Sequence, residues 1–284
     1  MLIDRSQLSF NFQGARYDLT DTRDRQFLGW VFNQFLYGEV TGIQCGYWLY
    51  RAPHLNAATF LAKQAGEELS HVRKILRILH LLGESPAAPH PAIRFLSTGM
   101  MGGSWGEHVA LEMALGEGLV LTVFYALADT ISHPEISKLL DSALAEEESH
   151  VRFGERETRA WLEQHPGDRS FLLAQAVLQS VALRFLKRFV LRTLRKTGRE
   201  DHGVLRQFSE FYDHTVRMFE RRVELLGISP RPMAELSPLT KAVLVLAIPF
   251  HKVRARFRRR RLLTDVYLED PMVHQELKHE LKRS

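Results

Sequence analysis

Apolar residues recur at intervals of three and four along most of this chain, which is the spacing of one face of a helix. Proline and glycine residues separate the apolar segments. Pro53 suits the first turn of a helix and Gly83 suits a helix end. The pattern predicts four long helices, over residues 22–50, 53–82, 104–131 and 134–164.

The second and third of these helices are joined by residues 84–103, which contain three prolines and several glycines. That composition disfavours a helix, so a long connection is expected there. No alternation of apolar and polar residues is long enough for a sheet, and the sequence therefore predicts an all-α protein. Further helices are expected over residues 171–196, 202–226 and 239–250, and an extended arm over residues 1–20.

A seven-residue pattern occurs twice in the predicted helices. The copies run from Glu67 to Arg73 and from Glu146 to Arg152, and each contains Glu-x-x-His. Residues three apart lie on one face of a helix, so each copy directs a carboxylate and an imidazole toward one point. The four residues concerned are Glu68, His71, Glu147 and His150.

Each copy is preceded by a glutamate that directly follows a glycine. Glu39 lies 29 residues before Glu68, and Glu117 lies 30 residues before Glu147. This spacing suits a helix of about 25 residues, a short turn and an antiparallel return to the same height. The sequence thus indicates a duplicated helix pair.

Other residues fit parts of the same pattern. Glu112 competes with Glu117, and Glu148 competes with Glu147. The glycine–glutamate alignment and the Glu-x-x-His spacing favour Glu117 and Glu147. A third Glu-x-x-His, over residues 276–279, lacks this context and is interpreted as accidental.

The set of six residues resembles the ferritin-like di-iron carboxylate superfamily, in which two helices each supply one Glu and two others each supply Glu-x-x-His. The resemblance covers about residues 22–165 and implies a ferritin-like four-helix bundle with a long crossover, followed by additional C-terminal helices. The expected divisions are an N-terminal arm over 1–21, the di-iron bundle over 22–166 and a basic helical extension over 167–284. Two iron ions are the implied cofactor, with manganese as the alternative. The implied metal ligands are Glu39, Glu68, His71, Glu117, Glu147 and His150.

Four carboxylates and two imidazoles suit iron or manganese. Carboxylates bridge cations and offset their charge, and each histidine adds one nitrogen. The alternative interpretation is that the glutamates are solvated charges on helix surfaces. Apolar residues on the same side as Glu68, such as Val72 and Ile75, oppose it, and so does the twofold repeat.

Two further acids, Glu67 and Glu146, directly precede the Glu of each Glu-x-x-His. Each is expected to accept the second N–H of a ligand histidine, either in its own helix or across the pair. The alternative is a surface ion pair with Arg73 or Arg152.

The first predicted helix carries glycines at every fourth position, Gly38, Gly42 and Gly46. Each costs a helix about 1 kcal/mol relative to alanine. Gly42 and Gly46 share the inward face of Glu39, which suggests either close helix packing or a substrate channel beside the metal. The channel would be bordered by Gly42, Gly46, Leu121 and Phe124.

The single cysteine, Cys45, excludes an intrachain disulfide and agrees with a reducing cytoplasm. It is expected to be a small apolar filler. Early charges at Asp4 and Arg5 argue against a signal peptide. The longest apolar run, Ala242 to Phe250, is too short to span a bilayer.

Charge is unevenly distributed along the chain. Residues 171–284 hold 23 Lys and Arg against 12 Asp and Glu, whereas the preceding residues carry an excess of acids. The second half is therefore expected to bind an anionic partner. Basic residues concentrate directly after the apolar run, as in an interfacial anchor on an anionic membrane. They are Lys252, Arg254, Arg256, Arg258, Arg259, Arg260 and Arg261.

Other partners fit the same basic segment. Nucleic acid is less favoured, because only Phe257 interleaves the arginines for base stacking. A solvated helix face or an oligomer contact, such as that of a homodimer, is the remaining interpretation.

The resemblance implies an O₂-dependent di-iron oxygenase or oxidase with an external electron donor. A single cysteine is too few for a rubredoxin-like centre, and Ile75 stands where radical-forming ribonucleotide reductase subunits carry a tyrosine. The leading hypothesis is a hydroxylase-type monooxygenase acting on an apolar or lipid-linked substrate, cytoplasmic and peripheral at the inner membrane surface. The alternatives are a di-iron hydroxylase of tRNA or another nucleic acid, and a ferroxidase or iron-binding protein without an organic substrate.

Overall fold

The computed structural model of the protein describes residues 1–94, 97, 102–196 and 203–256, with side chains as far as Phe250. The secondary structure of these residues is helical, with no strand among them, which confirms the all-α prediction. Arg258, Arg259, Arg260 and Arg261 lie outside the described residues, as does the Glu-x-x-His over 276–279.

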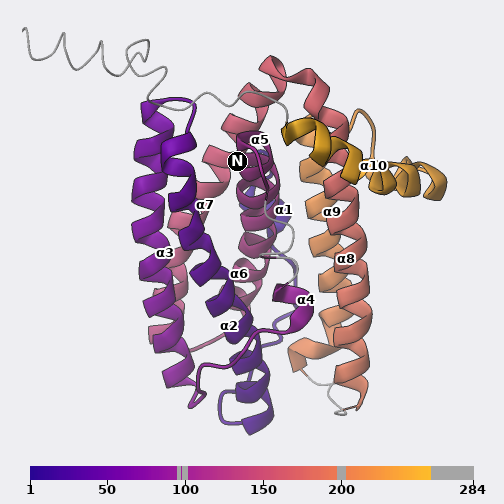
Figure 1. The fold of residues 1–284 in the computed structure, drawn as a ribbon. Coiled ribbons are helices and arrows are strands. Elements are labelled where there is room, and N and C mark those ends of the chain that lie inside the picture. The colour runs from indigo at the N-terminus through magenta and orange to yellow at the C-terminus, as the bar shows by residue number, and fades with distance from the viewer. Residues whose placement is uncertain (95–96, 98–101, 197–202, 257–284) are drawn as a thin grey trace, which may run out of the picture.

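Four long helices form the bundle that holds the predicted ligands (Figure 1). The third is continuous but changes its winding, from a short α turn through a π-helical segment to a second α segment. The elements are α2 (Thr22–Gly42), α3 (Leu55–Leu81), α5 (Trp105–Glu107), η3 (His108–Glu117), α6 (Gly118–Thr130) and α7 (Pro134–Gln164).

Side chains at the observed starts of these helices cap them. Asp21 accepts a hydrogen bond from the backbone N–H of Arg23 at the start of α2. His54, Ser104 and His133 do the same for the other three helices. Such caps satisfy backbone donors that the first turn leaves without partners.

Two of the predicted helices differ from a regular α-helix. The first gives way at Ile43 to the 3₁₀ segment η1 (Ile43–Arg51). The third contains the π-helical η3 where α7 packs most extensively against it. A Cβ on Gly154 of α7 would lie 2.6 Å from the backbone nitrogen of Ala114, so the two helices touch backbone to backbone. A π segment is often found at a functional site, and this one ends at Glu117.

The bundle core lies between α2, α3, α6 and α7. It includes Phe32, Leu79, Leu144 and two residues expected at the channel, Leu121 and Phe124. Leu121 and Phe124 are fully buried, and the Phe124 ring packs edge to face on Phe35 at 4.7 Å. Both residues are therefore part of the packed core.

The long helix of α5, η3 and α6, Trp105–Thr130, is the one described helix that is long and apolar enough to cross a membrane. Its most apolar window is 67% buried in the protein. Its place at the centre of the bundle accounts for this apolar character.

The remaining helices pack beside the bundle (Figure 1). α8 and α9 share a buried cluster with η3 that includes Leu111, Val177 and Phe219. α10 lies across α8. The bounds are α8 (Arg169–Lys196), η4 (Pro166–Asp168), η5 (Gly203–Gln207), α9 (Phe208–Leu225), η6 (Met233–Glu235) and α10 (Pro238–Arg256).

The N-terminal segment also packs onto the protein. It contains the short helix α1 (Arg5–Leu8), which the sequence did not predict, and Ile3 and Leu8 are buried in the bundle core. A second short helix, α4 (Pro91–Arg94), lies in the crossover. The arm, bundle and extension are thus joined by buried contacts.

Candidate metal centre

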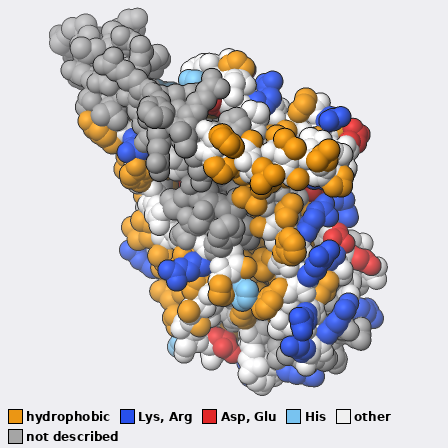
Figure 2. Space-filling model, turned by 45° about the vertical axis from the view of Figure 1, so that its right-hand side comes forward, with side chains coloured by type: hydrophobic (Ala, Val, Ile, Leu, Met, Phe, Trp, Pro, Cys, Tyr) orange, Lys and Arg blue, Asp and Glu red, His pale blue; other side chains and the backbone are white. Residues whose placement is uncertain are grey.

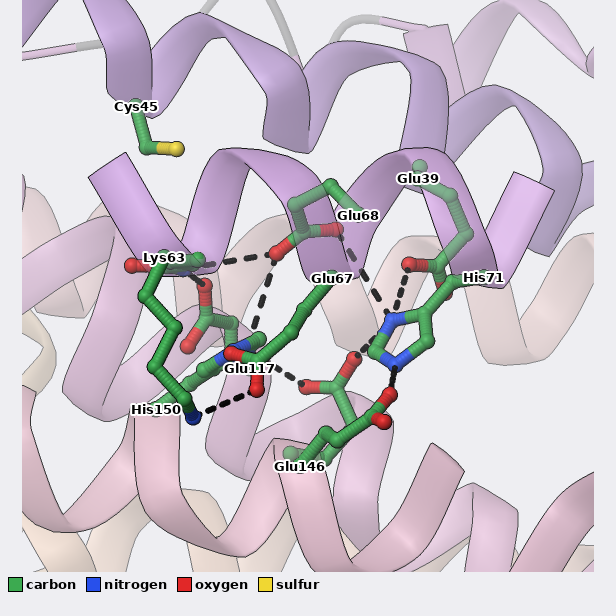
Figure 3. Close-up of polar contacts among 12 residues, drawn as sticks. Glu39, Cys45, Lys63, Glu67, Glu68, His71, Glu117, Glu146 and His150 are labelled. Carbon is green, nitrogen blue, oxygen red and sulfur yellow. Dashed lines mark hydrogen bonds and ion pairs between the residues drawn. The ribbon is translucent and has the colours of Figure 1, made fainter. Parts of the chain in front are cut away.

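The six predicted ligands converge from four helices in the middle of the bundle (Figure 3). They fall into two groups whose candidate ligand atoms lie within 4.8 Å of one another. The first group is Glu39, Glu68, His71 and Glu147, and the second is Glu68, Glu117 and His150.

Two of the carboxylates lie between the two imidazoles. Glu68 places Oε2 at 4.0 Å from Nδ1 of His71 and Oε1 at 3.5 Å from Nδ1 of His150. Glu147 places Oε1 at 3.1 Å and Oε2 at 3.8 Å from the same two nitrogens. One oxygen by each imidazole is the arrangement of a carboxylate that bridges two cations.

The outer carboxylates belong to one group each. Glu39 Oε2 lies 3.0 Å from Nδ1 of His71. Glu117 belongs to the group of His150, and its Oε1 accepts a hydrogen bond of 2.8 Å from Gln64. The set is therefore two shared carboxylates flanked on each side by one carboxylate and one imidazole.

Burial governs the electrostatics of this cluster. It raises the pKa of Glu39, Glu68 and Glu117, and the charges of neighbouring glutamates add to the effect. Burial alone would lower the pKa of His71, but its contacts with Glu147 and Glu39 outweigh this and raise it to about 11. Bound divalent cations would replace these protons and offset the carboxylate charge.

Three buried polar atoms in the cluster have no hydrogen-bond partner. They are Oε2 of Glu117, Oε2 of Glu147 and Nδ1 of His150. Buried polar atoms of a folded protein are normally satisfied, so atoms left over at one point indicate a missing cation or water. Together with the oxygen and nitrogen donor set, they show that these residues could hold a metal ion.

The two acids that precede the ligands reach across the bundle. Glu67 Oε2 lies 3.0 Å from Nε2 of His150, and Glu146 Oε2 lies 2.7 Å from Nε2 of His71. Each carboxylate therefore accepts the Nε2 proton and leaves Nδ1 facing the cluster. The sequence left open whether these contacts stay within one helix, and the structure places both across the pair.

Two lysines of α3 fix these acids from outside. Lys63 lies 2.5 Å from Glu67, and Lys74 lies 2.7 Å from Glu146. The sequence had instead suggested Arg73 and Arg152 as alternative partners of these acids. The i, i+4 spacing of Lys63 and Glu67 is a signal that could have identified the first lysine.

Gln64 is a further residue of the site, and the repeated motif gave no sign of it. Its amide nitrogen donates to Glu117 at 2.8 Å and lies 3.3 Å from Glu68, so it orients one outer and one shared carboxylate. It lies one helical turn before Glu68, on the same face. Ala143 stands at the equivalent place in the second copy, so this contact is made on one side only.

The glycine stripe corrects part of the channel prediction. A Cβ on Gly42 would lie 2.5 Å from Oε2 of Glu68, so this glycine makes room for a ligand carboxylate and does not border open space. A Cβ on Gly46 or Gly38 would meet nothing within 4 Å. The prediction that Gly42 borders a channel is therefore wrong. Of the two glycines assigned to the channel, Gly46 has open space beside it and Gly42 does not.

The two competing glutamates, Glu112 and Glu148, lie outside the two groups of candidate ligands. Glu112 Oε2 lies 2.8 Å from Nδ1 of His108, and its other oxygen accepts from the backbone of Gly102. Glu148 accepts a hydrogen bond of 2.6 Å from the hydroxyl of Tyr125.

Cys45 is buried beside the cluster (Figure 3). Burial raises the pKa of its thiol to about 12, and the charges of Glu68 and Glu117 add to the effect. The thiol is therefore neutral at physiological pH, in keeping with a small filler.

Comparisons of the chain with models of known protein families, with curated proteins and with solved structures found no match. The interpretation of the site therefore rests on the geometry of its side chains. The buried Glu and His groups fit a di-iron carboxylate site in a helical protein.

Proposed function

We propose that the chain is a di-iron oxidoreductase that uses O₂ to oxidise an apolar organic substrate. The observation that carries the proposal is the placement of Glu68 and Glu147, each with one oxygen beside each imidazole. Two iron ions held there would supply electrons to O₂ and so permit oxidation of a bound substrate, with an external donor restoring them. The same ligands accept manganese.

The residues of the site have distinct roles in this proposal. Glu68 and Glu147 would each offer an oxygen to both ions, and Glu39, His71, Glu117 and His150 would supply the remaining ligands. Glu67 and Glu146 keep the imidazoles oriented through Nε2. The burial of both imidazoles excludes bulk water, which strengthens every electrostatic contact in the site.

Apolar surroundings support an apolar substrate. Phe60 lies edge-on to the imidazole of His150, with ring centroids 6.1 Å apart, and stacks on Phe153 at 3.9 Å. Cys45, Trp48 and Phe153 belong to the same buried cluster. A polar substrate would lose hydration in such surroundings without compensation.

One observation favours a second candidate, a ferroxidase or iron-binding protein without an organic substrate. Glu68 fills the space at Gly42 where a channel was expected. The six ligands alone suffice for iron oxidation by O₂.

Oxygen uptake with product analysis tests the proposal. Protein loaded anaerobically with Fe(II) is mixed with a bacterial total lipid extract, a chemical reductant and O₂, and the lipids are analysed by mass spectrometry. We expect iron-dependent O₂ consumption and lipid species that have gained one oxygen atom or lost two hydrogens. A Glu147→Ala variant serves as the control and should form none. Oxygen uptake without any altered lipid would favour the ferroxidase.

A further inference from the structure

Two helices of the extension carry cations and no anions. α8 spans 28 residues with seven Lys and Arg, α10 spans 19 residues with four, and neither contains an Asp or a Glu. Acids from α9 neutralise two of the cations, since Arg184 pairs with Glu220 and Lys187 with Asp213. Arg188 and Arg192 are exposed on the outer side of α8. These helices therefore present a net positive surface.

α10 also has an apolar outer face. Leu239, Val243, Leu246 and Phe250 recur at steps of three and four, and Leu246 and Phe250 are 73% and 78% exposed. The opposite side of the helix is apolar as well, and there Ile248 is buried against Phe171 of α8. An ordinary surface helix would carry polar residues on its outer face.

The outer side of α8 repeats this combination. Val181, Phe185 and Phe189 recur every fourth residue and are exposed, with Phe185 at 62%. Arg188 lies over the ring of Phe185 at 5.6 Å. Apolar and cationic side chains thus run side by side on one helix.

The two helices pack against each other, so the two stripes belong to one part of the molecule. Figure 2, with this side turned forward, shows hydrophobic side chains gathered in a band with Lys and Arg side chains beside them. In the sequence of α10, the apolar residues are followed by Lys252, Arg254 and Arg256, the first part of the basic segment.

We propose that the outer faces of α8 and α10 form a docking surface for an anionic lipid bilayer. Large apolar side chains would enter the headgroup and acyl boundary while the arginines contact lipid phosphates. The bilayer interface accommodates both kinds of side chain at once. The surface is independent of the metal centre, so the proposal goes beyond the proposed function.

Other occupants fit the surface less well. A second copy docked by twofold symmetry would bring two cationic faces together, which costs energy through repulsion of like charges. Nucleic acid would satisfy the arginines but leave Leu239, Val243 and Leu246 exposed, since these aliphatic side chains offer no ring for base stacking.

Vesicle sedimentation of the full-length protein tests the docking surface. The probes are phosphatidylcholine vesicles with and without about 30% phosphatidylglycerol, at low and high NaCl. We expect binding that requires the anionic lipid and weakens at least tenfold between low and high salt. Leu246→Asp and Phe250→Asp should each weaken binding at least fivefold without lowering the melting temperature, because both side chains are exposed. Arg188→Glu combined with Arg192→Glu should do the same.

Leu76→Asp is the matched control, because Leu76 is an exposed leucine on α3, away from α8 and α10. It should bind vesicles as the parent protein does. Binding that is unaffected by Leu246→Asp and Phe250→Asp would overturn the proposal. So would a stable dimer, seen by light scattering without lipid, that Leu246→Asp dissociates. Tighter binding to single-stranded RNA than to anionic vesicles, lost in the same variants, would assign the surface to nucleic acid and also overturn it.

Discussion

The carboxylate of Glu67 on α3 lies 3.0 Å from Nε2 of His150 on α7, the opposite helix. The equivalent acid of the second copy, Glu146, makes the same contact with His71 in the other direction. Each half of the duplicated motif therefore orients the imidazole of the other half. The orientation of the two imidazoles therefore depends on α3 and α7 together.

Removing the charge of one crossing acid should weaken metal binding. In Glu67→Gln the imidazole of His150 loses a charged acceptor, and loss of such a partner typically costs about 10- to 100-fold in metal affinity. We expect a loss of this size in anaerobic Fe(II) or Co(II) titrations, with a folded protein. Glu146→Gln should give a similar loss at the other imidazole. Glu235→Gln, at an exposed position far from the site in sequence, is the control and should leave the metal affinity unchanged. Equal affinities for all three variants would contradict the role of Glu67 and Glu146 in orienting the imidazoles.

The glycine stripe allows a matched test of the role of Gly42. An alanine there would place Cβ 2.5 Å from Oε2 of Glu68 and displace this carboxylate, while an alanine at Gly38 meets nothing within 4 Å. Gly42→Ala should weaken metal binding at least tenfold with little loss of stability, because the displaced group is the end of a flexible side chain. Gly38→Ala should bind metal normally and gain up to about 1 kcal/mol in free energy of unfolding. Identical metal affinities would show that Glu68 is not held at Gly42.

The thiol of Cys45 should be unreactive in the folded protein. Its pKa is raised to about 12 and it is buried, so alkylation by iodoacetamide at pH 8 should be slow until urea unfolds the chain. The folded protein keeps the thiol protonated at pH values where the unfolded chain releases this proton, so raising the pH above the ordinary thiol pKa favours unfolding. The stability difference between the parent and Cys45→Ala should therefore be constant below pH 9.0, the ordinary thiol value, and shift against the parent above it. Rapid alkylation at pH 8 without denaturant would contradict the burial of this residue.

A buried ion pair joins the extension to the bundle. Nε of Arg222 on α9 lies 3.1 Å from Glu155 on α7, and the other oxygen of Glu155 accepts from the backbone of Leu2. Leaving the buried guanidinium without its partner typically costs about 3–5 kcal/mol. Glu155→Gln should lower the free energy of unfolding in urea by about this amount. Arg221→Ala, which removes an exposed ion pair with Glu224, is the control and should cost less than about 1 kcal/mol. Equal losses of stability in the two variants would contradict a stabilising role for the Arg222–Glu155 pair.

The sequence was informative where a local rule applies. Pro53 and Gly83 predicted the two ends of the second helix, and both lie close to the ends of α3 (Leu55–Leu81), because proline and glycine effects depend on neighbouring residues only. The six ligands could be predicted because duplication repeats the motif at a fixed distance, which separated Glu117 from Glu112 and Glu147 from Glu148.

The remainder depends on contacts between helices. The π-helical segment before Glu117 lies where Gly154 of α7 meets the backbone of Ala114, and no periodicity within the third helix indicates that approach. Whether Glu67 contacts a histidine of its own helix or one of α7 depends on the position of α7 relative to α3, which the sequence does not show. The role of Gly42 depends on the side-chain conformation of Glu68. The sequence therefore shows an unusual glycine inside a helix but not the carboxylate for which it makes room.

The number of iron ions bound per chain tests the central claim most directly. Protein loaded anaerobically with Fe(II) and freed of excess metal should contain two irons per chain by elemental analysis, with Mössbauer spectra of high-spin iron in oxygen and nitrogen coordination. The combined Glu68→Ala and His150→Ala variant should retain almost none while keeping its helical circular dichroism. Fewer than one iron per parent chain, or unchanged iron in the double variant, would contradict a metal centre at these residues.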